Sequence, residues 1–226
     1  MKYENIKTAT FLKRPNRFIA HIEVDGREEI CHVKNTGRCR ELLTDRAKIY
    51  VQQSDNPNRK TKYDLITVLK GKTLINMDSQ APNKVFHEWL IEGNFFEEIT
   101  LIKPECKYKN SRFDFYIEAK NRKIFAEIKG VTLEENGVVM FPDAPTERGV
   151  KHINELIECK REGYEAYIFF IVQMESCKYF TPNRKTHPNF ADALIKARDF
   201  GVNIIALNCT VTPDILKIKD NVPVDY

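Results

Sequence analysis

Two acidic side chains and a lysine have the types and spacing of a hydrolytic metal site. Asp114 lies in one predicted strand, and Glu127-Ile128-Lys129 lies in the next. Because side chains alternate along a strand, Glu127 and Lys129 should point to one side of the sheet and Ile128 to the other. A hairpin of this length can bring Asp114 beside Glu127, and paired carboxylates suit Mg²⁺ or Mn²⁺. Lys129 would then orient an attacking water or stabilise charge on a phosphate.

A third carboxylate, Glu88, lies on the helix predicted just before these strands. We expect it to reach the same site. The candidate catalytic residues are therefore Asp114, Glu127, Lys129 and Glu88, with the three acids as metal ligands. Spacing alone leaves an alternative open, in which these acids face solvent or pair with neighbouring basic side chains.

A second group of polar residues lies at the start of a helix predicted over residues 146–161. Arg148 and His152 are four positions apart and share a helical face, with Lys151 adjacent. Together with the positive end of the helix, these three side chains predict contacts to phosphate. Gly149 costs about 1 kcal/mol relative to alanine inside a helix, which indicates close packing or close approach of a substrate. The alternative is a capped helix with an ordinary solvated face.

The first third of the chain is basic. Residues 1–75 carry 16 Lys and Arg against 9 Asp and Glu, and the remainder carries 20 against 23, so +7 and −3 make up the net charge of +4. Aromatic residues lie among these cations, a pattern that suits contact with a nucleic-acid backbone and stacking on its bases. The alternative is that the aromatics fill the core of a small barrel. The candidate nucleic-acid contacts in this third are Arg14, Arg17, Arg38, Arg40, Arg59, Lys60 and Lys62.

The predicted elements divide the chain near residue 76. Short strands separated by Gly and Asn favour a small barrel or sandwich, over residues 9–13, 18–24, 29–33, 48–53, 64–69 and 73–77. Helices and strands then follow in the order α-β-β-β-α-β-α-β, over residues 82–93, 99–106, 112–118, 123–131, 146–161, 166–174, 189–200 and 202–207. We therefore expect an α/β chain, α+β overall, with domains over residues 1–76 and 77–226.

The composition excludes several classes of protein. With 42% hydrophobic and 30% charged residues over 226 positions, the chain can fill globular cores. It has no apolar run long enough to span a membrane and no apolar leader. Six scattered cysteines lack disulfide or zinc spacing, so we expect a cytoplasmic protein with no membrane partner. The glycine-rich nucleotide motifs and the serine-hydrolase elbow are absent.

Several of these stretches together resemble the sugar fermentation stimulation protein A (SfsA) family over essentially the whole chain. The matching stretches are residues 35–37, 54–56, 111–115, 127–133, 141–149 and 151–152. The resemblance implies an N-terminal OB-fold-like β-barrel and a C-terminal, restriction-endonuclease-like αβββαβ domain of the PD-(D/E)xK nuclease type. The family pattern maps onto Asp114, Glu127 and Lys129, and Glu88 matches the acidic position on the preceding helix. Phe113 stands where the motif has proline, which leaves the aspartate in place.

The residues and the resemblance predict a divalent-metal-dependent nuclease that hydrolyses phosphodiester bonds of DNA or RNA. The expected cofactor is Mg²⁺ or Mn²⁺, and the basic barrel would hold the strand, with DNA favoured over RNA. Since many nucleases of this type act as dimers, a homodimer is a further expectation. One alternative is a non-catalytic DNA-binding protein on a nuclease scaffold, a regulator of sugar metabolism as the family is usually described. Another is an interaction protein whose carboxylates are merely paired.

Overall fold

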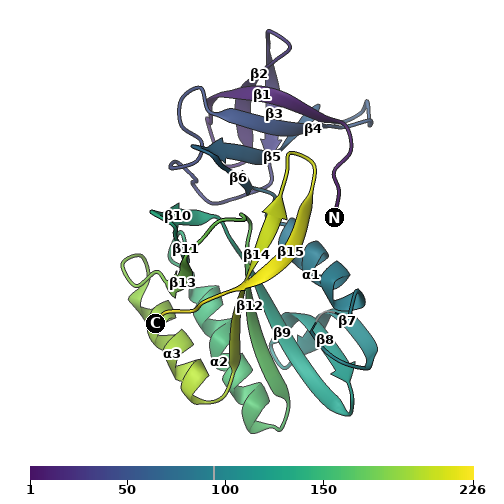
Figure 1. Cartoon of the computed structure of the whole chain (residues 1–226), viewed down its shortest axis with the longest axis vertical. Coiled ribbons are helices and arrows are strands. Elements are labelled where there is room, and N and C mark those ends of the chain that lie inside the picture. The colour runs from purple at the N-terminus through teal and green to yellow at the C-terminus, as the bar shows by residue number, and fades with distance from the viewer. Residues whose placement is uncertain (94) are drawn as a thin grey trace.

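The structure is a computed structural model and describes residues 1–93 and 95–226. Figure 1 shows two parts stacked along the long axis, a small barrel above and a sheet flanked by helices below. From the barrel the chain enters the lower part through β6 (Thr73–Asn76) and α1 (Ala81–Ile91), and its first residues also contact the lower part, where Lys2 forms a bridge with Ile215. None of the helices in the described residues is long and apolar enough to cross a membrane.

The first five strands close into the predicted barrel. Their order is β3-β2-β1-β4-β5, and a parallel pairing of β3 with β5 completes the ring. Every second residue of β2 is buried, with Ala20, Ile22 and Val24 pointing inward. Asp25 and Gly26 have φ values of 51° and 75°, so they form the predicted tight turn between β2 and β3. The barrel strands are β1 (Ile6–Lys13), β2 (Ile19–Val24), β3 (Arg27–Val33), β4 (Lys48–Gln53) and β5 (Tyr63–Lys70).

The lower part is a six-stranded mixed sheet in the order β15-β14-β12-β9-β8-β7. β12 lies parallel to both β9 and β14, and its run of apolar residues is buried on both faces, as a central strand requires. All the predicted helices and strands occur in the predicted order, with further strands between and after them. The elements are β7 (Ile99–Tyr108), β8 (Ser111–Ala119), β9 (Arg122–Val131), α2 (Glu147–Arg161), β12 (Glu165–Val172), α3 (Pro188–Asp199) and β14 (Asn203–Val211).

Four strands lie outside the prediction. Three of them form a small separate sheet, β10 (Leu133–Glu135), β11 (Val138–Phe141) and β13 (Tyr179–Pro182), and β15 (Leu216–Val222) pairs with β14 at the sheet edge. The first three are too short to show a hydrophobic period, and β15 carries charged residues on its exposed side. β11 is followed by the segment that leads into α2.

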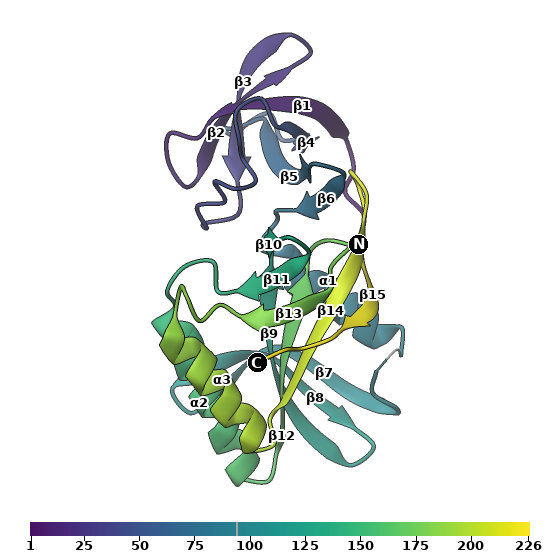
Figure 2. The same ribbon diagram turned by 60° about the vertical axis from the view of Figure 1, so that its left-hand side comes forward.

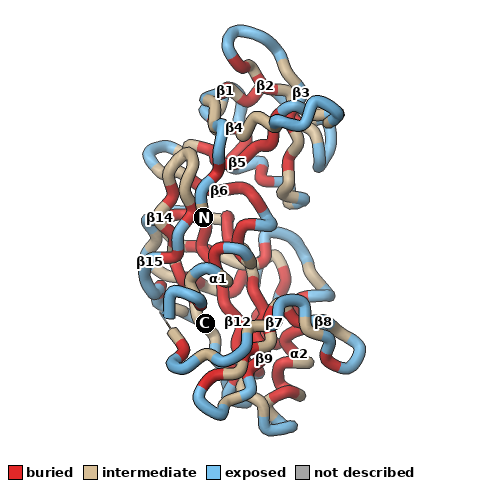
Figure 3. Tube along the Cα trace, turned by 90° about the vertical axis from the view of Figure 1, so that its right-hand side faces the viewer, coloured by how far each residue is buried: buried red, intermediate tan, exposed pale blue. Residues whose placement is uncertain are grey.

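The helices cover opposite faces of the large sheet (Figure 2). On one face, Phe86 of α1 packs against Phe115 and Phe169, with ring centroids 5.3 and 4.6 Å away. On the other face, α2 and α3 share a hydrophobic cluster with Phe113 and Phe170. Figure 3 shows that the buried positions follow the strands and the inner faces of the helices, while the turns are exposed.

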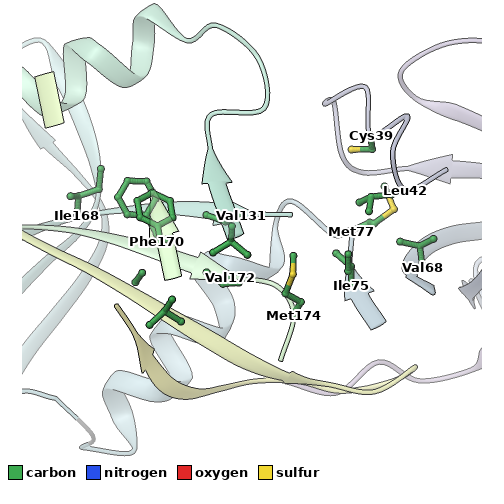
Figure 4. Packing of buried hydrophobic residues seen from close by; sticks show 14 of the residues in the cluster. Cys39, Leu42, Val68, Ile75, Met77, Val131, Ile168, Phe170, Val172 and Met174 are labelled. Atoms are coloured by element: carbon green, nitrogen blue, oxygen red, sulfur yellow. The ribbon is translucent and has the colours of Figure 1, made fainter. Parts of the chain in front are cut away.

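The barrel is packed onto the sheet by a shared core. Leu42 and Met77 from the barrel side belong to the same buried cluster as Val131, Val172 and Met174 from the sheet (Figure 4). Apolar burial of this kind supplies about 25 cal/mol per Å² of area removed from water, so the junction is a stable contact.

Polar contacts fix the same junction. The Gln173 side-chain amide donates to Asn76 Oδ1 and to the Asp78 carbonyl, each at 3.0 Å. The Tyr3 hydroxyl donates to Asp78 Oδ2 at 3.4 Å. Asn76, Met77 and Asp78 are buried at this crossing, and Ser79 and Gln80 are the exposed residues before α1.

Candidate active site

Asp114 and Glu127 face each other where β8 and β9 separate. The regular antiparallel pairing of the two strands ends at Phe115 and Ala126, so Asp114 and Glu127 occupy the next facing positions. Asp114 Oδ2 accepts the backbone N–H of Ile128 at 2.8 Å, in place of a backbone carbonyl. The structure therefore brings together the two carboxylates that the sequence paired.

Asp114 is held from two directions. Its Oδ1 accepts the side-chain amide of Asn83 on α1 at 2.9 Å, and its Oδ2 is bound by Ile128 as above. Burial, followed by the nearby charge of Glu127, raises the pKa of this carboxyl above its ordinary value. Asn83 was not among the predicted residues. The sequence clue to Asn83 is its position on the first turn of α1, next to the buried Pro82 and one helical turn before the inward-facing His87.

Glu127 is 2% exposed, and its two oxygens have different surroundings. Oε1 accepts from Lys129 Nζ and from His152 Nδ1, both at 2.5 Å. Oε2 is buried and has no hydrogen-bond partner among the described residues. Burial alone would raise the pKa of Glu127, but the His152 hydrogen bond and the Lys129 charge outweigh it and hold the pKa below its usual value.

His152 is a partner of Glu127 rather than an exposed phosphate contact, which corrects the sequence prediction. It is 4% exposed. Its Nε2 accepts from Arg148 Nε at 3.4 Å, so the proton on Nδ1 is the one donated to Glu127. Arg148 and His152 do share a helical face, as predicted, but α2 turns the His152 end of that face toward the sheet.

The start of α2 is fixed by its cap and by close packing. Thr146 Oγ1 accepts from Gly149 N at 3.1 Å, so Thr146 caps the helix. A Cβ on Gly149 would lie 2.9 Å from Thr146 Cγ2 and 3.1 Å from Phe190 Cε2. Gly149 is therefore needed for the contact between α2 and α3. Close packing is thus the explanation for this glycine, of the two that the sequence left open.

The structure does not bring Glu88 to the site. Its side chain is 51% exposed and forms an ion pair with the Met1 amino group at 2.6 Å. Asn83 and His87 occupy the face of α1 that meets β8, with the His87 ring stacked on Phe115. Glu88 is one residue further along, about 100° around the helix, and so points elsewhere. Asp114 and Glu127 are the two acids of the site.

A basic groove of about 590 Å³ lies beside the carboxylates. Arg148 and Lys151 line it as predicted, and residues from the turn between β7 and β8 form the opposite wall. Sequence reasoning missed this wall because only strand pairing brings it to α2. The lining residues are Lys107, Lys109, Asn110, Ser111, Arg112, Arg148, Lys151 and His152.

The predicted basic residues of the barrel fall into two groups. Arg14, Arg17, Arg38 and Arg40 line a common hollow of about 330 Å³. Arg59 is instead engaged with a carboxylate of the barrel, since it donates to both oxygens of the buried Asp64 at 2.6 and 2.9 Å. Lys60 and Lys62 lie in the same loop as Arg59, away from that hollow, with Lys62 Nζ 5.3 Å from the centre of the Tyr63 ring.

Family comparisons match both parts of the chain. Residues 12–77 match the model described as the SfsA N-terminal OB domain, and residues 80–215 match the sugar fermentation stimulation protein RE domain. The chain belongs to the SfsA family. This confirms the resemblance, and with the closed barrel and the αβββαβ order it confirms the predicted fold class.

Individual SfsA relatives are similar over their full length. The sugar fermentation stimulation protein homologue of Clostridium beijerinckii is 60% identical, covering 99% of both chains. That of Desulfitobacterium hafniense is 62% identical, covering 99% of this chain and 98% of the relative. A solved structure of SfsA from Pyrococcus furiosus in complex with Ca²⁺ is 29% identical, with a TM-score of 0.90, and covers 100% of this chain and 98% of that one.

The donor set of the SfsA site fits a hard divalent cation. Asp114 and Glu127 supply carboxylate oxygens, and the unpartnered Glu127 Oε2 is a buried anionic oxygen that a cation would satisfy. No cluster of three His, Cys, Asp or Glu side chains with metal-binding geometry occurs within residues 1–93 and 95–226. A cation here would therefore retain several water ligands, as Mg²⁺ usually does.

Proposed function

We propose that this SfsA protein is a divalent-metal-dependent nuclease that hydrolyses phosphodiester bonds of DNA or RNA. The observation that carries the proposal is the buried Glu127 Oε2, which has no partner although Asp114 and Lys129 lie beside it. A buried carboxylate oxygen without a donor is costly unless a cation binds it. Glu155 also has a buried Oε2 without a partner, but Glu127 has in addition a second carboxylate beside it, that of Asp114.

Each residue has a distinct part in this proposal. Asp114 and Glu127 would hold Mg²⁺ or Mn²⁺, which when bound activates a water and stabilises charge on the phosphate. Lys129, whose side chain is 17% exposed, keeps its ammonium at the mouth of the site, where it can orient the attacking water. His152 holds Glu127 Oε1, which leaves Oε2 free to bind.

Two further observations support the proposal. Arg148 and Lys151 line the basic groove beside the site, which supports their contact with phosphates next to the scissile bond. The Pyrococcus furiosus relative was solved with Ca²⁺, a cation with the same preference for oxygen ligands. The family description, sugar fermentation stimulation, names no reaction, so the chemistry rests on the site.

A cleavage assay tests the proposal. End-labelled single- and double-stranded DNA and RNA would be incubated with the wild type, Asp114→Ala and Lys129→Ala, in Mg²⁺, in Mn²⁺ and in chelator. We expect cutting that needs the metal and is lost in both variants, while binding is largely retained. Cutting that persists in both variants would contradict the assignment. Binding without cutting under any metal would favour the alternative, a DNA-binding protein on a nuclease scaffold.

A further inference from the structure

Four arginines of the barrel line one hollow, which we call the arginine hollow. It lies between the turn after β1 and the segment after β3, and it contains Arg14, Asn16, Arg17, Thr36, Gly37, Arg38, Arg40 and Leu43. Within residues 1–93 and 95–226, none of its four arginines forms an ion pair with a carboxylate. Several arginines elsewhere in the protein, such as Arg59 and Arg122, do have an acidic partner.

Arg14 builds the floor of the arginine hollow. Its guanidinium donates to four backbone carbonyls, those of Arg17 and Asn35 at 2.7 Å and those of Gly37 and Arg38 at 2.8 Å. These bonds tie the two wall segments together but leave the positive charge in place, because carbonyls are neutral acceptors. The hollow is thus both preorganised and positive before any ligand arrives.

The other three arginines of the hollow surround Arg14, beside an exposed aromatic ring. Arg38 and Arg40 are exposed and donate to no acidic group of the described chain. Phe18 is 50% exposed, and the Arg17 guanidinium carbon lies 5.6 Å from the centre of its ring. An exposed aromatic beside arginines is a platform on which an unpaired base can stack.

The arginine hollow adjoins the segment that leads to the active site. A Cβ on Gly37 would lie 2.3 Å from Asp143 Oδ2, so this glycine allows the barrel to touch the segment between β11 and α2. Figure 2 shows the turn after β3 reaching down toward that segment. The same segment continues into α2, whose Arg148 and His152 line the groove beside Glu127. The segment between β11 and α2 therefore runs from the arginine hollow toward the groove.

We propose that the arginine hollow binds the backbone phosphates of a single-stranded nucleic acid, the strand whose scissile phosphodiester lies at Asp114, Glu127 and Lys129. The second half of this statement rests on the proposed nuclease function, and the first half does not. The concave shape favours one strand, because its cations converge in a hollow of about 330 Å³, large enough for a nucleotide-sized group, and do not line a broad ridge. Phe18 favours one strand as well, because paired bases offer no face to a side chain outside the helix.

The test is a binding titration in chelator, where no metal-dependent cleavage occurs. Fluorescence anisotropy would compare a labelled single strand of about 20 nucleotides with the matching duplex over a range of salt concentrations. The hollow variant is Arg38→Ala/Arg40→Ala, which removes two exposed side chains. The matched control is Arg27→Ala/Lys72→Ala, which removes the same charge from barrel turns outside the hollow. Phe18→Ala tests stacking.

We expect the wild type to bind the single strand more tightly than the duplex. The hollow variant should lose about tenfold or more in single-strand affinity, with a salt slope smaller by about 1.4, the value for two phosphate contacts on a single strand. The control should change affinity by less than about threefold. Phe18→Ala should lose about fivefold or more with the single strand and little with the duplex.

Three results would overturn the proposal. They are equal losses in the hollow and control variants, tighter binding of the duplex, and displacement of the strand by inorganic phosphate at constant ionic strength, which would make the hollow a small-anion site. The two proposals fail separately. Absence of cleavage with the expected binding pattern would refute only the nuclease, and cleavage with binding unchanged in the hollow variant would refute only the hollow.

Discussion

Two buried carboxylates, Asp64 in the barrel and Glu127 in the sheet, have similar neighbours but are satisfied differently. Each accepts from a histidine Nδ1, and each lies beside a cationic side chain. At Asp64, Arg59 donates to both carboxylate oxygens and His32 adds a bond to Oδ1, so both oxygens are bound. At Glu127, both donors converge on one oxygen.

This difference distinguishes a carboxylate that stabilises the barrel from a carboxylate that has an oxygen available for a ligand. Arg59 and Asp64 form a bidentate pair, because planar guanidinium and carboxylate groups match each other's geometry. Neither carboxylate oxygen of Asp64 is then left to bind a ligand. The Glu127 site is open at Oε2, and it lies next to Asp114 and a basic groove. The same residue types thus hold the barrel together in one place and form a candidate reactive centre in the other.

The largest expected effect is on cleavage. Glu127→Gln should reduce metal-dependent cutting by about a hundredfold or more, because it removes the anionic oxygen that holds the cation. Asp64→Asn should change the rate by less than about threefold, since its partners Arg59 and His32 belong to the barrel and not to the candidate site. Initial rates on the preferred substrate, at saturating metal, measure both. Similar losses in the two variants would mean that the two carboxylates do not differ in function.

The next effect concerns the histidine partners. His152→Ala should weaken Mn²⁺ binding by about 10- to 100-fold, because the bond to Glu127 Oε1 orients the carboxylate. His32→Ala, the matched change at Asp64, should leave Mn²⁺ affinity unchanged. Isothermal titration calorimetry on folded variants gives both affinities. Unchanged binding in His152→Ala would show that Glu127 needs no such support.

Some features of the site could be predicted from the sequence, because they depend on residues that are close together in the chain. Strand alternation predicted that Glu127 and Lys129 share a side, because the period of a strand is local. The pairing of Asp114 with Glu127 followed from hairpin length. The helix predicted over residues 146–161 was also predictable, because capping of its start depends on neighbours three residues away.

Other features depend on how elements dock. Glu88 missed the site because one residue on a helix is a rotation of about 100°, and nothing local fixes that phase. His152 is buried because α2 lies against β9. This packing cannot be predicted from the α2 segment alone. The cations of the β7–β8 turn join the groove through tertiary packing. The bond between Arg59 and Asp64, which removed Arg59 from the predicted contacts, also needs the folded barrel.

A smaller effect is on stability. Asp64→Asn should lower the free energy of unfolding by about 2 kcal/mol, because it leaves Arg59 and His32 without their charged partner. Urea denaturation in chelator measures the change. A loss below about 0.5 kcal/mol would mean that the bidentate pair contributes no more than an exposed surface pair does.

The smallest effect is the pH dependence of stability, and it has opposite signs at Asp64 and Asp114. The pKa of Asp64 is lowered in the fold, where the bonds from Arg59 and the charge of Lys34 outweigh burial. Its stabilisation is therefore present above the unfolded pKa of about 4 and is lost as pH falls through the folded pKa. The gap between wild type and Asp64→Asn should narrow on acidification below about pH 4.

Asp114 should behave in the opposite way, since burial and Glu127 raise its pKa in the fold. The stabilisation from its protonated form is present below the unfolded pKa of about 4 and is lost as pH rises through the folded pKa. Asp114→Asn should therefore be slightly more stable than wild type at pH 7 in chelator, and equal to it in acid. Thermal unfolding across pH gives the comparison, and a destabilised Asp114→Asn at pH 7 would contradict it.

The most direct test of the account is to locate the cation. Crystals of the wild type soaked in Mn²⁺ would be measured for anomalous scattering, with Glu127→Gln crystals as the control. We predict a peak within coordination distance of Glu127 Oε2 and an Asp114 oxygen, about 2.0–2.2 Å away, that is absent in the variant. A wild-type map without a peak there, or a peak that persists in Glu127→Gln, would contradict the assignment of this site.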